Sequence, residues 1–72
     1  MESFRLTWKY LNDDCEQYEY AGNEQELKEM FDRLVMLNDD LEYAVGDKTE
    51  VYTIEGSVPY EETEILYEYY ND

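Results

Sequence analysis

Alternating apolar and polar residues predict that most of this chain forms β-strands. In residues 4–10 large apolar side chains occupy every second position, which indicates a strand with one apolar face. Three turn-forming residues follow, Asn12-Asp13-Asp14, and residues 16–20 alternate again. We therefore expect these two segments to pair as a hairpin.

A helical spacing replaces the alternation after residue 22. Asn23 is a suitable N-cap, because its side chain can accept a hydrogen bond from the backbone of Glu26. The polar run Asn38-Asp39-Asp40 is expected to end the helix, which we place at residues 24–37. Apolar residues recur there every three or four positions and define one buried face: Leu27, Met30, Phe31, Leu34 and Val35.

The second half of the chain returns to alternation and predicts three more strands. They are expected at residues 41–45, 50–55 and 64–69, with a turn at Gly46-Asp47-Lys48 and a loop marked by Gly56 and Pro59. Alternation places the following side chains inward: Tyr43, Val45, Tyr52, Ile54, Ile65, Tyr67 and Tyr69. The order is ββαβββ, and short connections favour antiparallel pairing. We expect one α+β domain spanning residues 1–72, with an antiparallel sheet of four to five strands covered on one face by a single helix.

Charge is the most unusual feature of the composition. The 72 residues include 20 Asp and Glu but only 5 Lys and Arg, for a net charge of −15. The solubility of a small domain needs only about 2–8 net charges. Nucleic acids and anionic membranes repel such a chain, so we expect it to bind neither directly. Its partner is expected to be a basic protein, above all one that binds nucleic acid.

Residues that carry most enzymatic chemistry are missing. Histidine is absent, which removes the commonest general base and the commonest neutral metal ligand. The single cysteine, Cys15, lies among acids that lower thiol reactivity, and it cannot form an intrachain disulfide. The acidic turns at Asp13-Asp14 and Asp39-Asp40 lack the residue order of an EF-hand calcium loop. We therefore expect no enzyme activity, no cofactor and no dedicated metal site.

Acidic clusters and two tyrosines are the candidate partner-binding residues. Carboxylates two apart on a strand, or three to four apart on a helix, can form rows that meet the Lys and Arg of a partner. Tyrosine is favoured in protein interfaces. The candidates are Asp13, Asp14, Glu16, Glu19, Glu29, Asp32, Tyr60, Glu62, Glu64, Glu68 and Tyr70. A solvated acidic surface is the alternative for each cluster. Arg5 and Lys9 are expected to pair with glutamates on neighbouring strands.

In size, acidity and its nine tyrosines, the chain resembles the small acidic inhibitors encoded by phages and mobile elements. That class includes anti-CRISPR proteins, anti-restriction proteins and uracil-DNA glycosylase inhibitors that mimic DNA. The chain shares no family motif with them, so the resemblance assigns no residue roles. It implies an inhibitor that mimics DNA charge and blocks the nucleic-acid-binding groove of a bacterial defence or DNA-processing protein. A compact fold about 28 Å across would span roughly 17 phosphates of duplex DNA, close to its charge of −15.

Two other functions fit the same composition. One is an acidic interaction module, such as an immunity or adaptor protein, that binds a basic partner without competing with nucleic acid. The other is a domain whose acidity serves solubility or a salty habitat. Residues 1–10 lack the apolar segment of a signal peptide, so a cytoplasmic location is expected, in the bacterial host cell if a phage or mobile element encodes the protein. Both a monomer and a homodimer fit this picture.

Overall fold

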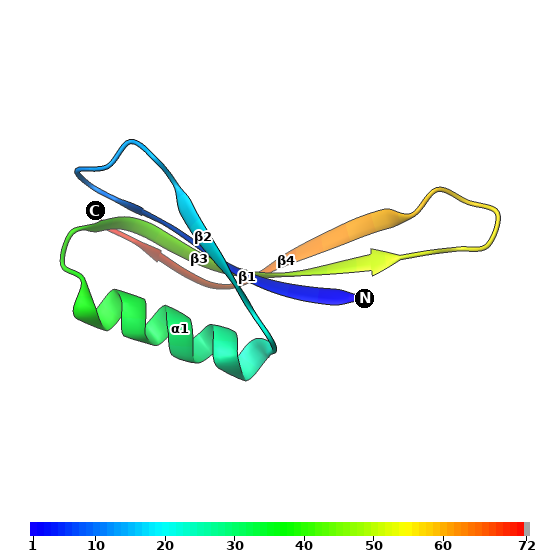
Figure 1. Ribbon diagram of the computed structural model, residues 1–72, viewed down its shortest axis with the longest axis horizontal. Helices are drawn as coiled ribbons and strands as arrows, with labels where there is room; N and C mark the ends of the chain where they lie inside the picture. Colours follow the sequence, from blue (N-terminus) through cyan, green and yellow to red (C-terminus); the bar gives the residue numbers. More distant parts are fainter. Residues whose placement is uncertain (72) are drawn as a thin grey trace.

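One helix lies on one face of a four-stranded antiparallel sheet (Figure 1). The computed structural model describes residues 1–71. The strands lie in the order β2-β1-β3-β4, so β1 and β3 are central and β2 and β4 are the edges. The predicted α+β class, with a sheet covered on one face by a single helix, is confirmed. The elements in chain order are β1 (Glu2–Tyr10), β2 (Gln17–Ala21), α1 (Glu24–Leu37), β3 (Leu41–Tyr52) and β4 (Tyr60–Tyr70).

Helix α1 begins and ends where the sequence predicts. The Asn23 side chain accepts a hydrogen bond of 2.8 Å from the backbone N–H of Glu26, which satisfies one of the free donors at the helix start. At the other end the Asn38 side-chain amide donates to the carbonyl oxygen of Leu34 over 2.8 Å. Both ends of the helix are therefore closed by an asparagine.

The turn predicted at Gly46-Asp47-Lys48 is wrong, because β3 runs through these residues as one strand. The order is therefore ββαββ and the sheet has four strands. Close packing, rather than a turn, accounts for a glycine at position 46. A Cβ at this position would lie 3.2 Å from the Tyr67 ring and 3.4 Å from Leu27. A glycine inside a strand commonly marks such a close approach.

Two β-bulges, one on β3 and one on β4, change which side chains face the helix. Tyr10 pairs with Leu41 but Lys9 pairs with Tyr43, so β3 bulges at Glu42. On β4 the bulge falls at Leu66, because the partners of Gly46 and Asp47 are Tyr67 and Ile65. Each bulge inserts one residue and so reverses the alternation beyond it.

The bulges explain why several predicted core residues are not in the core. Directly paired residues share a face of the sheet. Gly46 lies against Leu27 of the helix, and its partner Leu6 therefore faces the helix too. The alternate residues Arg5, Thr7 and Lys9, with their partners on β3, point away from the helix. Tyr43, Val45 and Ile65 were predicted to point inward and instead lie on this uncovered side. We call it the helix-free face, formed by Arg5, Thr7, Lys9, Tyr18, Tyr20, Tyr43, Val45, Asp47, Ile65, Glu68 and Tyr70.

The buried core is small for the length of the chain. Its fully buried apolar side chains are Leu6, Leu27, Leu41 and Ala44. The predicted inward position of Tyr67 is confirmed: its ring lies 5.7 Å from that of Phe31, centroid to centroid, between helix and sheet. With so few buried groups, each contributes a large share of the free energy of folding.

The molecule is longer and thinner than a compact chain of this size. Its extents are 48 × 25 × 18 Å, and its radius of gyration is 14.2 Å rather than the roughly 11 Å of a compact fold. The β3–β4 hairpin, residues 48–64, runs beyond the part of the sheet that α1 covers (Figure 1). We call this hairpin the arm. Ile54 was predicted to face inward but lies in the loop at the tip of the arm, 55% exposed.

We predict that Leu27→Ala lowers the free energy of unfolding by about 2–5 kcal/mol, because it leaves a cavity over Gly46 that the sheet cannot fill. Urea unfolding followed by circular dichroism measures the change. Leu37→Ala is the matched control, since Leu37 lies on the same helix and is 75% exposed. Equal effects of the two substitutions would show that the helix is not held by Leu27.

Candidate functional site

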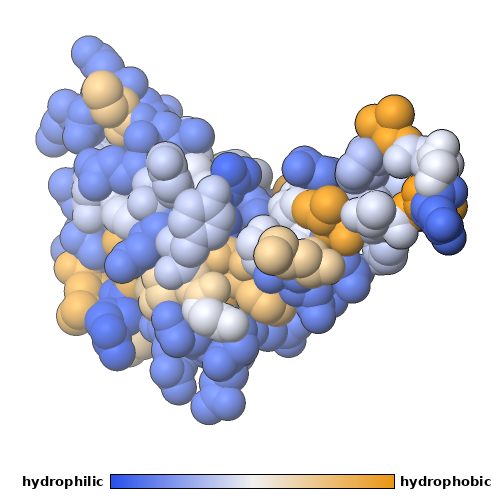
Figure 2. Space-filling view, turned by 45° about the vertical axis from the view of Figure 1, so that its right-hand side comes forward, coloured by the Kyte–Doolittle hydropathy of each residue, from blue (hydrophilic) through white to orange (hydrophobic). Residues whose placement is uncertain are grey.

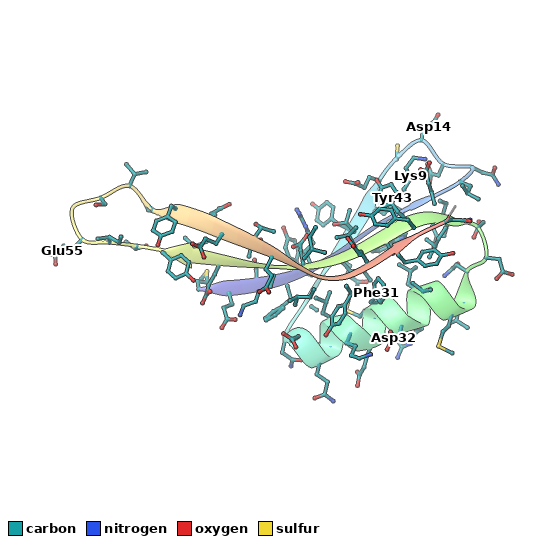
Figure 3. All side chains as sticks on the ribbon, turned by 180° about the vertical axis from the view of Figure 1, so that it is seen from behind. Lys9, Asp14, Phe31, Asp32, Tyr43 and Glu55 are labelled. Carbon is teal, nitrogen blue, oxygen red and sulfur yellow. The ribbon has the colours of Figure 1, made fainter. Side chains whose placement is uncertain are left out.

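The acids predicted around the β1–β2 turn have different environments. Asp13 accepts hydrogen bonds from the backbone N–H of Cys15 at 3.0 Å and from the Gln17 amide at 3.4 Å. Glu16 accepts a hydrogen bond from the Tyr43 hydroxyl. Asp14 is exposed at the tip of the turn (Figure 3). Asp13 and Glu16 thus shape the turn, while Asp14 is directed toward solvent.

The acids predicted on the helix and on β2 do not form one row. Asp32 pairs with Lys28 at 2.9 Å, so its charge is locally balanced, whereas Glu29 is exposed. Glu19 points to the helix side of β2 and, with Arg33, borders a cavity of about 260 Å³ that is otherwise largely apolar. These three acids therefore face three different surroundings.

The acids predicted on β4 are split between two faces by the bulge at Leu66. Glu62 and Glu64 pair with Glu50 and Lys48 in the arm, on the side that continues the helix-covered face. Glu68 pairs with Val45 and lies on the helix-free face. The expected single row of β4 carboxylates is therefore broken.

A different acidic row crosses the arm. Glu2 pairs with Glu50, and Glu50 pairs with Glu62, so three glutamates occupy directly opposed positions on three neighbouring strands about 4.8 Å apart. Lys48 contacts Glu2 at 2.9 Å and offsets part of this charge. Like charges directly opposite one another destabilise a sheet. This row, which we call the arm row (Glu2, Glu50, Glu62), was not predicted because it depends on strand register.

Aromatic rings flank the arm row. The rings of Tyr52 and the predicted Tyr60 are stacked with centroids 5.1 Å apart. The Tyr52 hydroxyl donates a hydrogen bond of 2.7 Å to Glu50. This hydrogen bond is the main cause, and burial the second cause, of a rise in the pKa of Tyr52 to about 12. At the tip of the arm, apolar Ile54 and Val58 are exposed, and Figure 2 shows hydrophobic atoms gathered there.

The helix-free face exposes several tyrosines. Tyr18 and Tyr20 on β2 are 63% and 59% exposed and meet edge to face, with centroids 5.7 Å apart. Tyr70, a predicted candidate, is exposed on β4, and its ring centroid lies 6.5 Å from that of Tyr43. Sequence reasoning missed Tyr18 and Tyr20 as surface groups. The sequence does contain a signal for their exposure. Tyr20 and Tyr18 pair with the polar residues Arg5 and Thr7 in the hairpin, and paired residues share a face of the sheet.

Basic side chains neutralise the middle of the sheet. Lys9 pairs with Glu42 at 2.7 Å, which confirms the predicted pairing with a neighbouring glutamate. The Lys9 pKa is raised first by this hydrogen bond and then, against an opposing effect of burial, by the charge of Glu42. Arg5 pairs with an aspartate instead, Asp47, at 3.4 Å. The unbalanced acids are thereby left at the turns, the helix surface and the arm.

The chemistry available to residues 1–71 is limited. No three acidic or cysteine side chains among them converge closely enough to hold a metal ion. Cys15 is an exposed free thiol in the β1–β2 turn. The helix of this described part of the chain is too short and too polar to cross a membrane.

We predict that the tyrosinate absorbance of the folded protein shows two groups titrating near pH 12, Tyr43 and Tyr52. The hydrogen bond from Tyr43 to Glu16 is the largest cause of its shift, so Glu16→Gln should lower the Tyr43 pKa toward the ordinary value of 10.0. Because the folded pKa is raised, the linked stability is present below pH 10 and is lost as pH rises through 12. Glu50→Gln is the control, since it should lower the pKa of Tyr52 and leave that of Tyr43.

We predict that Glu62→Gln stabilises the protein by about 0.2–1 kcal/mol, because it removes one like charge from the arm row. Urea unfolding at low salt measures the gain, which should shrink at about 0.5 M salt as the repulsion is screened. Glu61→Gln is the matched control, because Glu61 pairs with the uncharged Val51. An equal gain from both substitutions would mean that net charge, rather than the register of the row, causes the repulsion.

Comparisons with known proteins give no relative for this chain. No protein-family model, no curated protein and no solved structure matches it. Its possible function therefore follows from its charge, its shape and its exposed side chains.

Proposed function

We propose that this chain is a protein-binding inhibitor that enters the nucleic-acid-binding groove of a bacterial defence protein, such as a CRISPR complex, or of a DNA-processing protein. The observation that carries the proposal is the density of charge along the molecule. A net charge of −15 over a length of 48 Å is one charge per 3.2 Å or so. A single DNA strand carries one charge per about 3.4 Å.

This match is to one DNA strand rather than to a duplex. A duplex carries about one charge per 1.7 Å, twice the density of the protein. A groove whose Lys and Arg contact one backbone would meet a similar spacing of charge on this chain. The long-range attraction would also speed association at low ionic strength.

The arm is the part best suited to enter such a groove. It carries five glutamates and one lysine in residues 48–64, and most of it extends beyond α1 and β2. The arm row brings like charges into register at a cost in stability. A basic groove would relieve that repulsion on binding, so part of the binding free energy would come from charges that the free protein holds together unfavourably.

We predict that a protein captured from bacterial lysate at low salt is released by single-stranded or duplex DNA as well as by a salt gradient. The variant Glu50→Gln/Glu62→Gln/Glu64→Gln should weaken capture by about tenfold or more, because it removes three desolvated charge contacts. The matched control is Glu24→Gln/Asp39→Asn/Asp40→Asn, which removes the same charge from exposed positions outside the arm. Capture that yields to salt and ignores DNA would reject the groove-binding function.

The exposed tyrosines favour a second candidate function, an acidic interaction module whose partner has no nucleic-acid groove. Tyr18, Tyr20 and Tyr70 offer ring surface of the kind that anchors protein interfaces and has no counterpart in a phosphate backbone. In that case Tyr18→Ser/Tyr20→Ser would abolish capture, and competing DNA would have no effect. If the chain is instead a groove-binding inhibitor, the same tyrosines would contact the partner beside its nucleic-acid-binding groove.

A further inference from the structure

A polar pocket of about 240 Å³ opens on the helix-free face, where the arm leaves the body of the sheet. Its lining includes Arg5 of β1, Tyr20 of β2, Asp47 and Thr49 of β3, and Glu61 and Thr63 of β4. Ligand pockets for small molecules are usually larger, about 300–1,000 Å³. The volume therefore suits one amino-acid side chain of a partner.

Asp47 is the least satisfied group in this pocket. It is 6% exposed, and its carboxylate shares one oxygen, Oδ2, with Arg5 at 3.4 Å, which is long for an ion pair. The other oxygen, Oδ1, is buried and accepts no hydrogen bond within residues 1–71. A buried carboxylate oxygen without a donor carries an uncompensated desolvation penalty. A donor arriving from the pocket would remove it.

The other walls of the pocket supply acceptors for a cation. The hydroxyl oxygens of Thr49 and Thr63 lie 3.0 Å apart and hydrogen-bond to each other, which leaves lone pairs free. Glu61 adds a second carboxylate to the lining, and the exposed Tyr20 ring adds an electron-rich face. Two carboxylates against the single guanidinium of Arg5 leave the pocket with a negative charge.

We propose that this pocket receives a lysine side chain of the protein partner. An ammonium group is a compact charge with three donors, which can be shared among Asp47 and the two threonine hydroxyls. An arginine fork is less suited, because it needs both oxygens of one carboxylate and Arg5 already occupies Oδ2. For the buried Oδ1 to meet the ammonium group, the Asp47 carboxylate must rotate about χ2, its terminal side-chain torsion. This torsion has no sharply preferred angle in aspartate, so the rotation costs little. The inference rests on the basic partner of the proposed function.

The test is an amide NMR titration of the labelled protein at low salt with N-acetyl-lysine-N-methylamide. The uncharged analogue N-acetyl-norleucine-N-methylamide is the ligand control. We expect saturable shifts at Thr49 and Thr63 with a millimolar Kd, weakened by about tenfold or more in Asp47→Asn. Glu55→Gln, which removes an exposed acid at the tip of the arm (Figure 3), should leave the Kd unchanged. Thr63→Val is a second pocket variant, for use if Asp47→Asn unfolds.

Two results would overturn the inference: shifts spread evenly over the acidic surface, or equal weakening by Glu55→Gln and the pocket variants. The proposed function is read separately, from release of the captured partner by DNA. If DNA still competes while the lysine analogue ignores the pocket, only the lysine site is wrong. If the pocket binds lysine while captured partners ignore DNA, only the groove-binding function is wrong.

Discussion

The helix is held on the sheet where the side chain of Leu27 lies over the backbone of Gly46. A Cβ at Gly46 would lie 3.2 Å from the Tyr67 ring, which is tighter than most side-chain contacts, and 3.4 Å from Leu27, so glycine gives the helix its closest approach to the sheet here. Leu27 is fully buried and is the most enclosed side chain of α1. β3 continues through Gly46 and on into the arm, paired with β1 and β4. This packing contact holds α1 over the body of the domain, and the β3–β4 hairpin extends beyond it.

Charge is arranged around the two central strands. Three ion pairs join β1 to β3, namely Arg5–Asp47, Lys9–Glu42 and Lys48–Glu2. Partly exposed pairs of this kind contribute little individually, about 0–1 kcal/mol each. Their placement still has an effect, because it concentrates basic residues at the centre of the sheet. The acids beyond it remain available to a partner, and their repulsion limits the stability of a fold with a small core.

Local chemistry in the sequence was enough to predict the helix, its asparagine cap, the first hairpin and the α+β class. Prediction failed wherever the outcome depended on contacts between distant residues. Gly46-Asp47-Lys48 has the composition of a turn, but pairing with the distant strands β1 and β4 makes it part of a strand. The bulges at Glu42 and Leu66 leave no local signature, yet they place Tyr43, Val45 and Ile65 on the helix-free face. For the same reason the arm row and the Asp47 pocket could not be read from spacing alone.

The outer end of the arm has a consequence for the kinetics of any complex. The N-terminal residue pairs with Val51, and beyond it the hairpin is supported only by itself. Two-stranded ribbons are marginally stable in water, so amide protons beyond Val51 are expected to exchange with solvent faster than those of the central strands. A partner that holds the tip must also order it, which offsets part of the favourable contact energy. Such a contact would combine rapid, charge-steered arrival with ready dissociation, as the proposed inhibitor would need for reversible action.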